Sequence, residues 1–298
     1  MPKAKKKVRS PLKLLGGKGT LRNRIIRYFP EHRVYVEPFG GGGSVLLAKE
    51  PCEVEVYNDR DPHPVEVFRA IQNKDTLRRL SELLWMTPYS RLEREYARLQ
   101  WDDEEDELVR AAMYFVNSRQ SFGGNIDRTS WGLVTTSTAR GKAQPVNAYI
   151  EAIKMLPHIR ERIKDVHIYN DDYWEVIKKY DSKGTLFYLD PPYPHDTRRD
   201  GFYECEMGDR DHQKLVKRLL KRKGCILLSG YWNEIYDELL EEHDWAVVEF
   251  RRACSSVART RYTGLQGAGT VRAAQERIDC LWMCPKTQAA LDIEIVTE

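Results

Sequence analysis

Apolar residues follow two different spacings along this chain. Short runs rich in β-branched and aromatic residues, bounded by glycine, proline or acidic residues, are typical of buried strands. Such runs predict strands at 34–36, 54–57, 166–169, 185–189 and 225–229, and a closing hairpin from 245–250 and 277–283. Helical spacing predicts helices at 21–28, at 44–49 with Ser44 as N-cap, at 91–99, at 104–115, and in the stretch around Leu215 to Leu220. Alternating strands and helices predict an α/β fold with a mostly parallel central sheet and helices on both faces.

The centre of the chain breaks this pattern. From Asn117 to Asn147 the apolar residues have no regular spacing, and Gly, Ser, Thr, Arg and Asn dominate. A long irregular segment inside a compact domain usually has a function. We therefore expect this stretch either to contact a ligand or to act as a lid over one.

Composition narrows the class of protein. The 298 residues are 41% hydrophobic and 31% charged, which is normal for a folded domain and argues against disorder. No stretch reaches the roughly 20 apolar residues that a membrane span needs, and the lysine-rich start lacks the apolar region of a secretory signal. The six cysteines form no CxxC pair, so we expect reduced thiols, no metal site and a cytoplasmic protein.

The net charge of +3 says little, but the cations are clustered. A basic tail covers residues 1–10, a second group lies in the acid-poor central stretch, and a third lies between Arg251 and Arg272. Clusters of this kind can neutralise phosphates, although any one of them can equally be a solvated face.

The most informative residues are Asp190, Pro191, Pro192 and Tyr193, which directly follow the apolar run 185–189. Two prolines cannot continue a strand ladder, so the strand must end there. A carboxylate and an aromatic ring are thereby held at the carboxyl end of a strand, where open α/β sheets bind their ligands. The carboxylate and the free proline carbonyls can accept hydrogens from a flat polar substrate on which the ring stacks.

A second ligand-binding signal follows the first predicted strand. Four glycines, Gly40 to Gly43, would let a ligand approach the backbone closely, and Asp59 ends the next strand, where it can accept ribose hydroxyls. A dinucleotide fingerprint would need glycine at position 45, which is Val45, and no Gly-Lys-Ser/Thr of a phosphate-binding loop follows. A cofactor with a ribose but no phosphate is favoured, and S-adenosylmethionine has that description.

Several motifs occur together and in order: Leu12 to Lys18, Val36 to Gly43, Asn58-Asp59, Asp190 to Tyr193, Met207 to His212, Leu228 to Tyr231, and Asp279 to Trp282. In this order the set resembles the DNA adenine methylase family, the D12 class of N6-adenine-specific DNA methyltransferases. The resemblance covers about residues 11 to 285 and is thin between 75 and 150. It implies a Rossmann-like S-adenosylmethionine-dependent methyltransferase fold with a target-recognition insertion.

The resemblance also implies a role for each matching residue. Lys18 would contact the cofactor, the segment from Glu37 to Gly43 would wrap its methionine part, and Asp59 would bind its ribose. Asp172 matches the acid near the cofactor adenine, with Asp171 as the competing candidate. Asp190, Pro191, Pro192 and Tyr193 would hold the target adenine as the catalytic set. The full cofactor set is Leu14, Gly17, Lys18, Glu37, Pro38, Phe39, Gly40, Gly42, Asp59, Asp172 and Asp190. At Leu14 the family often has an aromatic residue.

The resemblance implies double-stranded DNA as the partner and a bacterial or phage-infected cell as the setting. We expect a tail at 1–10, a catalytic domain at 11–74 and 151–298, and a recognition insertion at 75–150. Arg119, Asn125, Arg128 and Arg140 are the side-chain types that contact base edges or phosphates, and they are our candidate DNA contacts.

Three rival functions stay open. An N4-cytosine methyltransferase uses the same amine chemistry, but that class more often has Ser where this chain has Asp190. A non-catalytic DNA-binding subunit on a methylase scaffold is disfavoured by the intact motifs, and RNA would have to be single-stranded. The recognition sequence, the oligomeric state and the presence of a companion restriction endonuclease are left open by the sequence.

Overall fold

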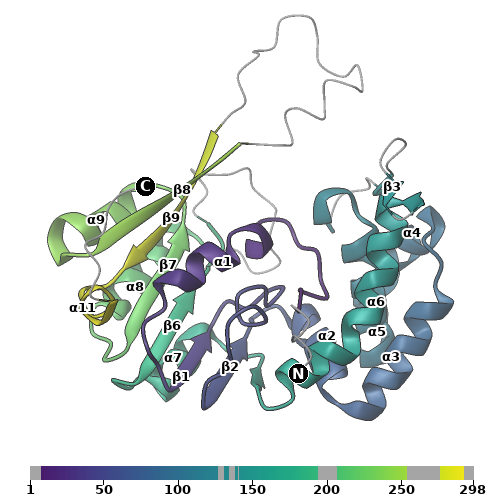
Figure 1. Cartoon of the computed structure of the whole chain (residues 1–298), viewed down its shortest axis with the longest axis horizontal. Coiled ribbons are helices and arrows are strands. Elements are labelled where there is room, and N and C mark those ends of the chain that lie inside the picture. Colours follow the sequence, from purple (N-terminus) through teal and green to yellow (C-terminus); the bar gives the residue numbers. More distant parts are fainter. Residues whose placement is uncertain are drawn as a thin grey trace, which may run out of the picture.

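In the computed structural model the described residues are 8–126, 131–133, 138–139, 141–193, 207–253 and 276–291. They contain a seven-stranded sheet in the order β5-β2-β1-β6-β7-β9-β8 (Figure 1). The five strands that pair in parallel are β1 (Val34–Glu37), β2 (Val54–Asn58), β5 (His167–Tyr169), β6 (Thr185–Leu189) and β7 (Cys225–Gly230). The hairpin of β8 (Ala246–Ala253) and β9 (Glu276–Met283) closes the sheet, with β9 antiparallel to both of its neighbours. The mixed α/β fold predicted from the sequence, with a mostly parallel sheet, is confirmed.

Side chains of the central strands alternate between two apolar layers, as the period of a strand requires. Val36, Val56 and Phe187 belong to one layer together with α7 (Tyr173–Tyr180), α8 (Asp209–Leu219) and α9 (Glu234–His243). Their neighbours Tyr35, Tyr57 and Leu186 belong to the other layer, with the short α1 (Arg22–Ile25) and a group of helices. The sheet is therefore buried on both faces, which explains why its strands read as continuous apolar runs.

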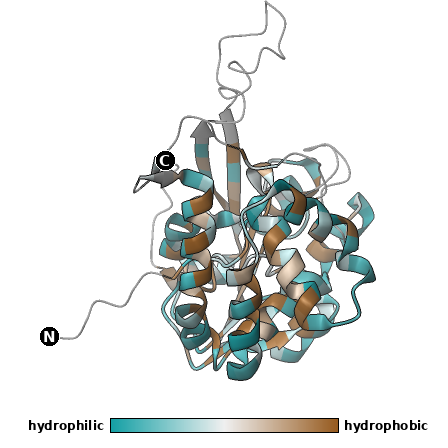
Figure 2. Ribbon diagram, turned by 90° about the vertical axis from the view of Figure 1, so that its right-hand side faces the viewer, coloured by the Kyte–Doolittle hydropathy of each residue, from teal (hydrophilic) through white to brown (hydrophobic). Residues whose placement is uncertain are grey.

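The group of helices lies beside the sheet on the right of Figure 1. It consists of α2 (Pro62–Gln72), α3 (Lys74–Met86), α4 (Arg91–Gln100), α5 (Glu107–Gln120) and α6 (Gln144–Ile163). Figure 2 shows hydrophobic and hydrophilic residues alternating along these helices, so that each can bury one side. None of the helices in the described ranges is both long and apolar enough to cross a membrane.

Short elements complete the described chain. Single 3-10 turns are η1 (Lys18–Thr20), η2 (Ile26–Tyr28), η3 (Trp101–Asp103) and η4 (Phe122–Gly124). A small hairpin pairs β3 (Thr138–Ala139) with β4 (Lys142–Ala143), and α11 (Pro285–Leu291) follows the last strand.

Two expectations about local structure were wrong, and several helices were missed. Residues 44–49 form turns where a helix was predicted: the Leu47 and Lys49 N–H groups donate four residues back, but the Ala48 N–H between them donates to the Val45 carbonyl three residues back, so no regular α-helical ladder forms. The stretch from 117 to 147 is more regular than predicted, since α5 extends into it and α6 begins within it. The helices α2, α3, α6, α9 and α11 were not predicted at all. The domain boundaries inferred from the sequence stay a prediction.

Candidate active site

A cleft opens at the carboxyl ends of β1 and β6. These two strands are neighbours in the sheet. The strand that pairs with β1 on its other side is β2, and the strand that pairs with β6 on its other side is β7, so the chain continues in opposite directions from the two strands. Such a switch point is where an open α/β sheet leaves a crevice for a ligand. The residues lining the cleft come from the segment 14–18, from 37–45, from the loop 59–64, from Tyr114 and 124–126, and from Tyr173, Tyr188, Asp190, Pro192 and Met207.

The glycines after β1 form a wall made of backbone. A Cβ atom on Gly40 would lie 2.2 Å from the ring of Tyr57, so a side chain at this position has no room. Gly41 has φ +45°, a conformation that favours glycine. Its N–H donates to Asp59 Oδ2 at 2.6 Å, and its carbonyl accepts the Tyr57 hydroxyl at 2.7 Å. This wall can therefore lie against a ligand without intervening side chains.

Two carboxyl groups flank the glycine wall. Glu37, at the end of β1, accepts from the Tyr35 hydroxyl and the Leu46 N–H, both at 3.0 Å. Burial raises the pKa of Glu37 to about 8 and the pKa of Asp59 to about 7. Near neutral pH both acids thus lie close to their titration points, and a cationic or hydroxyl-donating ligand would favour their ionised forms.

Asp190 directly follows β6 and lines the same cleft. Its Oδ1 atom is 2.6 Å from Lys18 Nζ, although the two residues are far apart in sequence. Burial raises the pKa of Asp190, and the Lys18 ammonium opposes that shift. Lys18 also donates to the Tyr193 hydroxyl and lies 4.8 Å from the centroid of that ring. The lysine therefore links the acid and the aromatic ring of the sequence motif.

Tyr193 is not among the residues that line the cleft. Only 5% of its surface is exposed, and its ring meets Tyr231 edge-on with centroids 4.6 Å apart. A base could stack on this ring only after the neighbouring side chains had moved.

The charges of the cleft fit a cationic, phosphate-free cofactor. Glu37, Asp59, Asp61 and Asp190 line it, against the cations Lys18 and Arg60. An excess of acids disfavours a pyrophosphate, whereas it suits a sulfonium and an ammonium group. The described residues hold no group of three or more His, Cys, Asp or Glu side chains that could bind a metal ion. S-adenosylmethionine fits both the acids and the backbone wall.

Most of the residues predicted from the sequence are brought together here. The cleft is lined by Leu14, Gly17, Lys18, Glu37, Pro38, Phe39, Gly40, Gly42, Asp59, Asn125, Asp190 and Pro192. Asp172 is exposed and caps α7 by accepting from the Trp174 N–H at 2.9 Å. The exposed Asp171 contributes its backbone, bonded on both sides to Asn58. Neither aspartate lines the cleft, whereas the next residue, Tyr173, does.

The candidate DNA contacts are more scattered. The Arg119 guanidinium donates to the carbonyls of Ser10 and Pro11, both at 2.6 Å, and burial lowers its pKa to about 10. In this position Arg119 braces the segment that leads to Lys18. Asn125 lies at the cleft. Arg128 and Arg140 lie outside the described residues.

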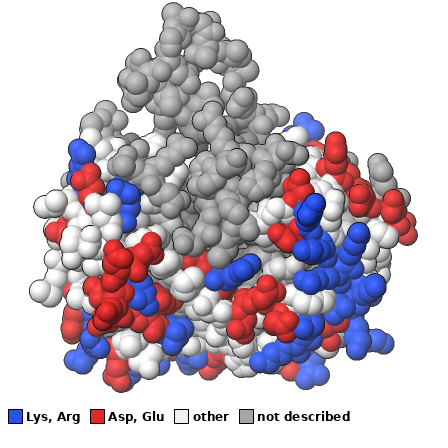
Figure 3. Space-filling model, turned by 180° about the vertical axis from the view of Figure 1, so that it is seen from behind, with Lys and Arg blue, Asp and Glu red and all other residues white. Residues whose placement is uncertain are grey.

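Sequence reasoning missed several residues of the cleft. Tyr173 packs against Phe39 with ring centroids 5.0 Å apart, and Tyr114 and Met207 contribute further apolar surface. The position of Tyr173 directly after Asp172 was the available signal. A concentration of cations was also missed: exposed Lys residues gather on α7, α8 and the turn after α8, toward the right of Figure 3. They do not line the cleft and are not part of this site.

Comparison with known proteins agrees with the geometry. The family described as D12 class N6 adenine-specific DNA methyltransferase matches residues 15–254, a range that includes both strand ends of the cleft. A DNA adenine methylase of Salmonella typhimurium strain LT2 is 25% identical over 264 residues, which cover 86% of this chain and 92% of that protein. The DNA adenine methylase of Escherichia coli K12 is 24% identical over 264 residues with the same coverage. A type II methyltransferase of Methanocaldococcus jannaschii is 24% identical over 281 residues, 85% of this chain and 95% of that protein.

Proposed function

The chain belongs to the D12 class of N6 adenine-specific DNA methyltransferases, and we propose that it methylates the N6 amine of an adenine flipped out of duplex DNA, with S-adenosylmethionine as donor. The observation that carries the proposal is the shared cleft of Asp190 and the glycine wall of residues 40–42. One side offers an acceptor for an amine, and the other offers a surface for the donor. Both are needed within reach of one another for methyl transfer.

Base flipping is proposed because the chemistry needs it. The N6 amine of a paired adenine lies inside the duplex, and an enzyme that modifies the base must extrude it at a cost of a few kcal/mol. Asp190 lies within a cleft that also holds the glycine wall, and only 19% of its side chain is exposed. A base in the duplex stack could not reach such a carboxylate, which supports extrusion.

The catalytic contribution of the chain is positioning and electrostatics. Asp190 and the Pro191 carbonyl would accept the two hydrogens of the N6 amine, drawing electron density toward the nitrogen. The ionised carboxylate would also stabilise the positive charge that develops on N6. When bound, S-adenosylmethionine would supply the electrophilic methyl group and leave as S-adenosylhomocysteine, and the proton that N6 loses would pass to the Asp190 carboxylate or to solvent. Glu37 and the glycine wall would hold its methionine part and Asp59 its ribose.

Lys18 gives this site a further feature. Its ammonium is 2.6 Å from the oxygen of Asp190 that the target amine could use, and its side chain is buried. The positive charge favours the ionised carboxylate before a base arrives. The target amine must then either take the second carboxylate oxygen or displace Lys18, and displacement would also uncover the ring of Tyr193 for stacking.

The proposal is tested with labelled S-adenosylmethionine and DNA from a strain without adenine methylation. After digestion to nucleosides, we expect the label in N6-methyladenine. Label in N4-methylcytosine would instead support the cytosine-specific rival, and no incorporation together with tight DNA binding would support a non-catalytic subunit. Sequencing the methylated adenines would at the same time give the recognition site.

A further inference from the structure

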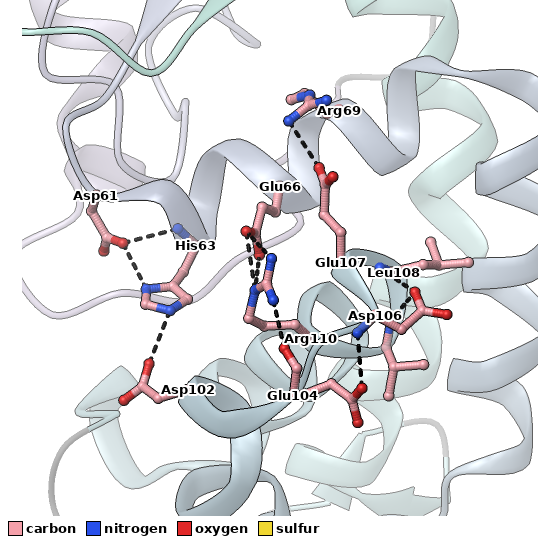
Figure 4. A network of polar contacts seen from close by, with 11 residues as sticks. Asp61, His63, Glu66, Arg69, Asp102, Glu104, Asp106, Glu107, Leu108 and Arg110 are labelled. Carbon is pink, nitrogen blue, oxygen red and sulfur yellow. Dashed lines mark hydrogen bonds and ion pairs between the residues drawn. The ribbon is translucent and has the colours of Figure 1, made fainter.

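The helix α2 is joined to the segment 101–110 by three ion pairs (Figure 4). His63 Nε2 lies 3.1 Å from Asp102 Oδ1, Glu66 Oε1 lies 2.6 Å from Arg110 Nη2, and Arg69 Nη1 lies 2.9 Å from Glu107 Oε1. The three pairs follow one another along one side of α2. They attach η3 and α5 to α2, the element that directly follows the Asp59 loop.

Only the first of these pairs continues into the cleft. His63 Nδ1 is 2.8 Å from Asp61 Oδ1, the same oxygen that caps α2 by accepting from the His63 N–H. The Asp61 N–H in turn donates to Asp59 Oδ1 at 2.9 Å, while Gly41 holds Asp59 Oδ2. We name Asp102, His63, Asp61 and Asp59 the histidine relay. It leads from a residue on the surface to the acid that faces the ribose position.

The geometry of the relay offers a hydrogen-bond partner to each ring nitrogen of its histidine. Nδ1 and Nε2 both lie within reach of carboxylate oxygens, which only accept, so the ring makes both hydrogen bonds at once only in its protonated form. Hydrogen bonds between an imidazolium and carboxylates are among the stronger ones in proteins. The ring is also held by packing: it lies nearly parallel to Trp101 and Tyr114, at centroid distances of 4.5 and 5.4 Å. Its orientation is therefore set from every side.

We propose that His63 is a positioning residue for cofactor binding, through which Asp102 orients the loop of Asp59. The inference rests on the proposed use of S-adenosylmethionine. Without the imidazole ring, the Asp61 carboxylate keeps only its capping bond from the His63 N–H, and the loop is held to Asp59 by the Asp61 N–H alone. The carboxylate of Asp59 would then meet the ribose hydroxyls in a less defined position. The effect falls on cofactor affinity and not on the methyl-transfer step, because no member of the relay contacts Asp190.

The relay can be tested at its exposed end. Asp102 has 63% of its side chain exposed, so Asp102→Asn removes the charge with little risk to the fold. Glu107→Gln is the matched control, because Glu107 forms an ion pair with α2 that has no link to Asp59. Asp102→Glu restores the carboxylate and serves as the rescue. Calorimetry would give the Kd for S-adenosylhomocysteine, and methyl transfer to unmethylated DNA would give kcat and the KM for S-adenosylmethionine.

We expect Asp102→Asn to raise Kd and KM about 3- to 10-fold with kcat within about twofold of the unaltered chain. Glu107→Gln and Asp102→Glu should stay within about twofold in all three constants. His63→Gln should resemble Asp102→Asn or exceed it. The inference is overturned if Asp102→Asn binds as tightly as the unaltered chain, if Glu107→Gln weakens binding equally, or if kcat falls while KM stays constant. If the unaltered chain binds neither cofactor form, the proposed function fails as well, which the first titration shows.

Discussion

The two walls of the cleft are held in place by different forces. The glycine wall that follows β1 is mostly backbone, and it is tied to the neighbouring strands of the sheet. Gly40 N–H donates to the Asn58 carbonyl at 2.7 Å, and the fully buried Asn58 side chain bonds the carbonyls of Pro38 and Asp171. The side-chain amide of Asn58 therefore connects the ends of β1, β2 and β5.

The facing wall contains Asp61, Tyr114 and residues 124–126, and side chains hold it. Ion pairs join α2 to η3 and α5, and Arg119 anchors the segment of Ser10 and Pro11. The Ile126 carbonyl accepts from the Asn117 amide at 3.1 Å. A wall made of backbone has no side chain that can move aside, whereas the side-chain contacts of the facing wall can be weakened one at a time. We therefore expect substitutions in the glycine wall to reduce cofactor affinity most.

The largest effect expected from this comparison is at Gly40. Gly40→Ala places a methyl group 2.2 Å from the buried Tyr57 ring, so the wall must shift. Overpacking of this kind typically costs about 1–3 kcal/mol of stability. A shift of the wall that cost binding a similar amount would weaken cofactor affinity by up to about 150-fold. Gly19→Ala is the control, because a Cβ there meets nothing within 4 Å. Calorimetry with S-adenosylhomocysteine measures both, and equal affinities for the two variants would contradict a backbone wall.

A smaller effect is expected at Tyr193. Tyr193→Ala removes the ring and should lower kcat/KM for DNA about 30-fold, within the roughly 1–3 kcal/mol that base–aromatic stacking contributes. Tyr193→Phe keeps the ring and loses only the hydroxyl that contacts Lys18, so we expect less than about a fivefold decrease. Steady-state methylation of unmethylated DNA compares them. If both variants lose the same activity, the ring does not stack on the target.

The smallest effect is a pH dependence carried by Asp59. Its pKa of about 7 means that the acid is protonated below neutral pH and ionised above it. Because the proposed role of the carboxylate is to accept ribose hydroxyls, S-adenosylhomocysteine should bind about tenfold more tightly at pH 8 than at pH 6. Asp59→Asn should bind S-adenosylhomocysteine more weakly, and its affinity should no longer change with pH around 7. Any pH dependence that remains should come from Glu37, near its pKa of about 8. Affinity that falls with rising pH in the unaltered chain would contradict this role.

The same two walls differ in how far they could be predicted. The strand ends at Glu37, Asn58 and Leu189 follow from local runs and stops, and parallel pairing then brings Gly40, Asp59 and Asp190 to one edge. The contact between Lys18 and Asp190 could not be predicted, because it joins distant segments and depends on how the turn of η1 packs.

The group of helices was harder to predict. Asp61 as N-cap with Pro62 at the first position is a helix start signal, but the β-branched Val65 and Val67 in α2 obscure it. Pro157 lies inside α6, and in the sequence a proline at such a position predicts the end of a helix, although α6 continues past it. The ion pairs between α2 and α5 depend on which faces of the two helices meet. Single residues do not reveal such a choice, so the histidine relay appears only in the folded chain.

The central claim is that Asp190 carries the chemistry while the glycine wall carries the donor. The most direct test measures methyl transfer and S-adenosylhomocysteine affinity together in Asp190→Ala, with Asp190→Asn as a variant of unchanged size. We predict that transfer falls by at least about 1,000-fold in Asp190→Ala, because its preorganised acceptor is lost, while the Kd stays within about tenfold. Substantial methylation by Asp190→Ala, with cofactor affinity unchanged, would contradict the account.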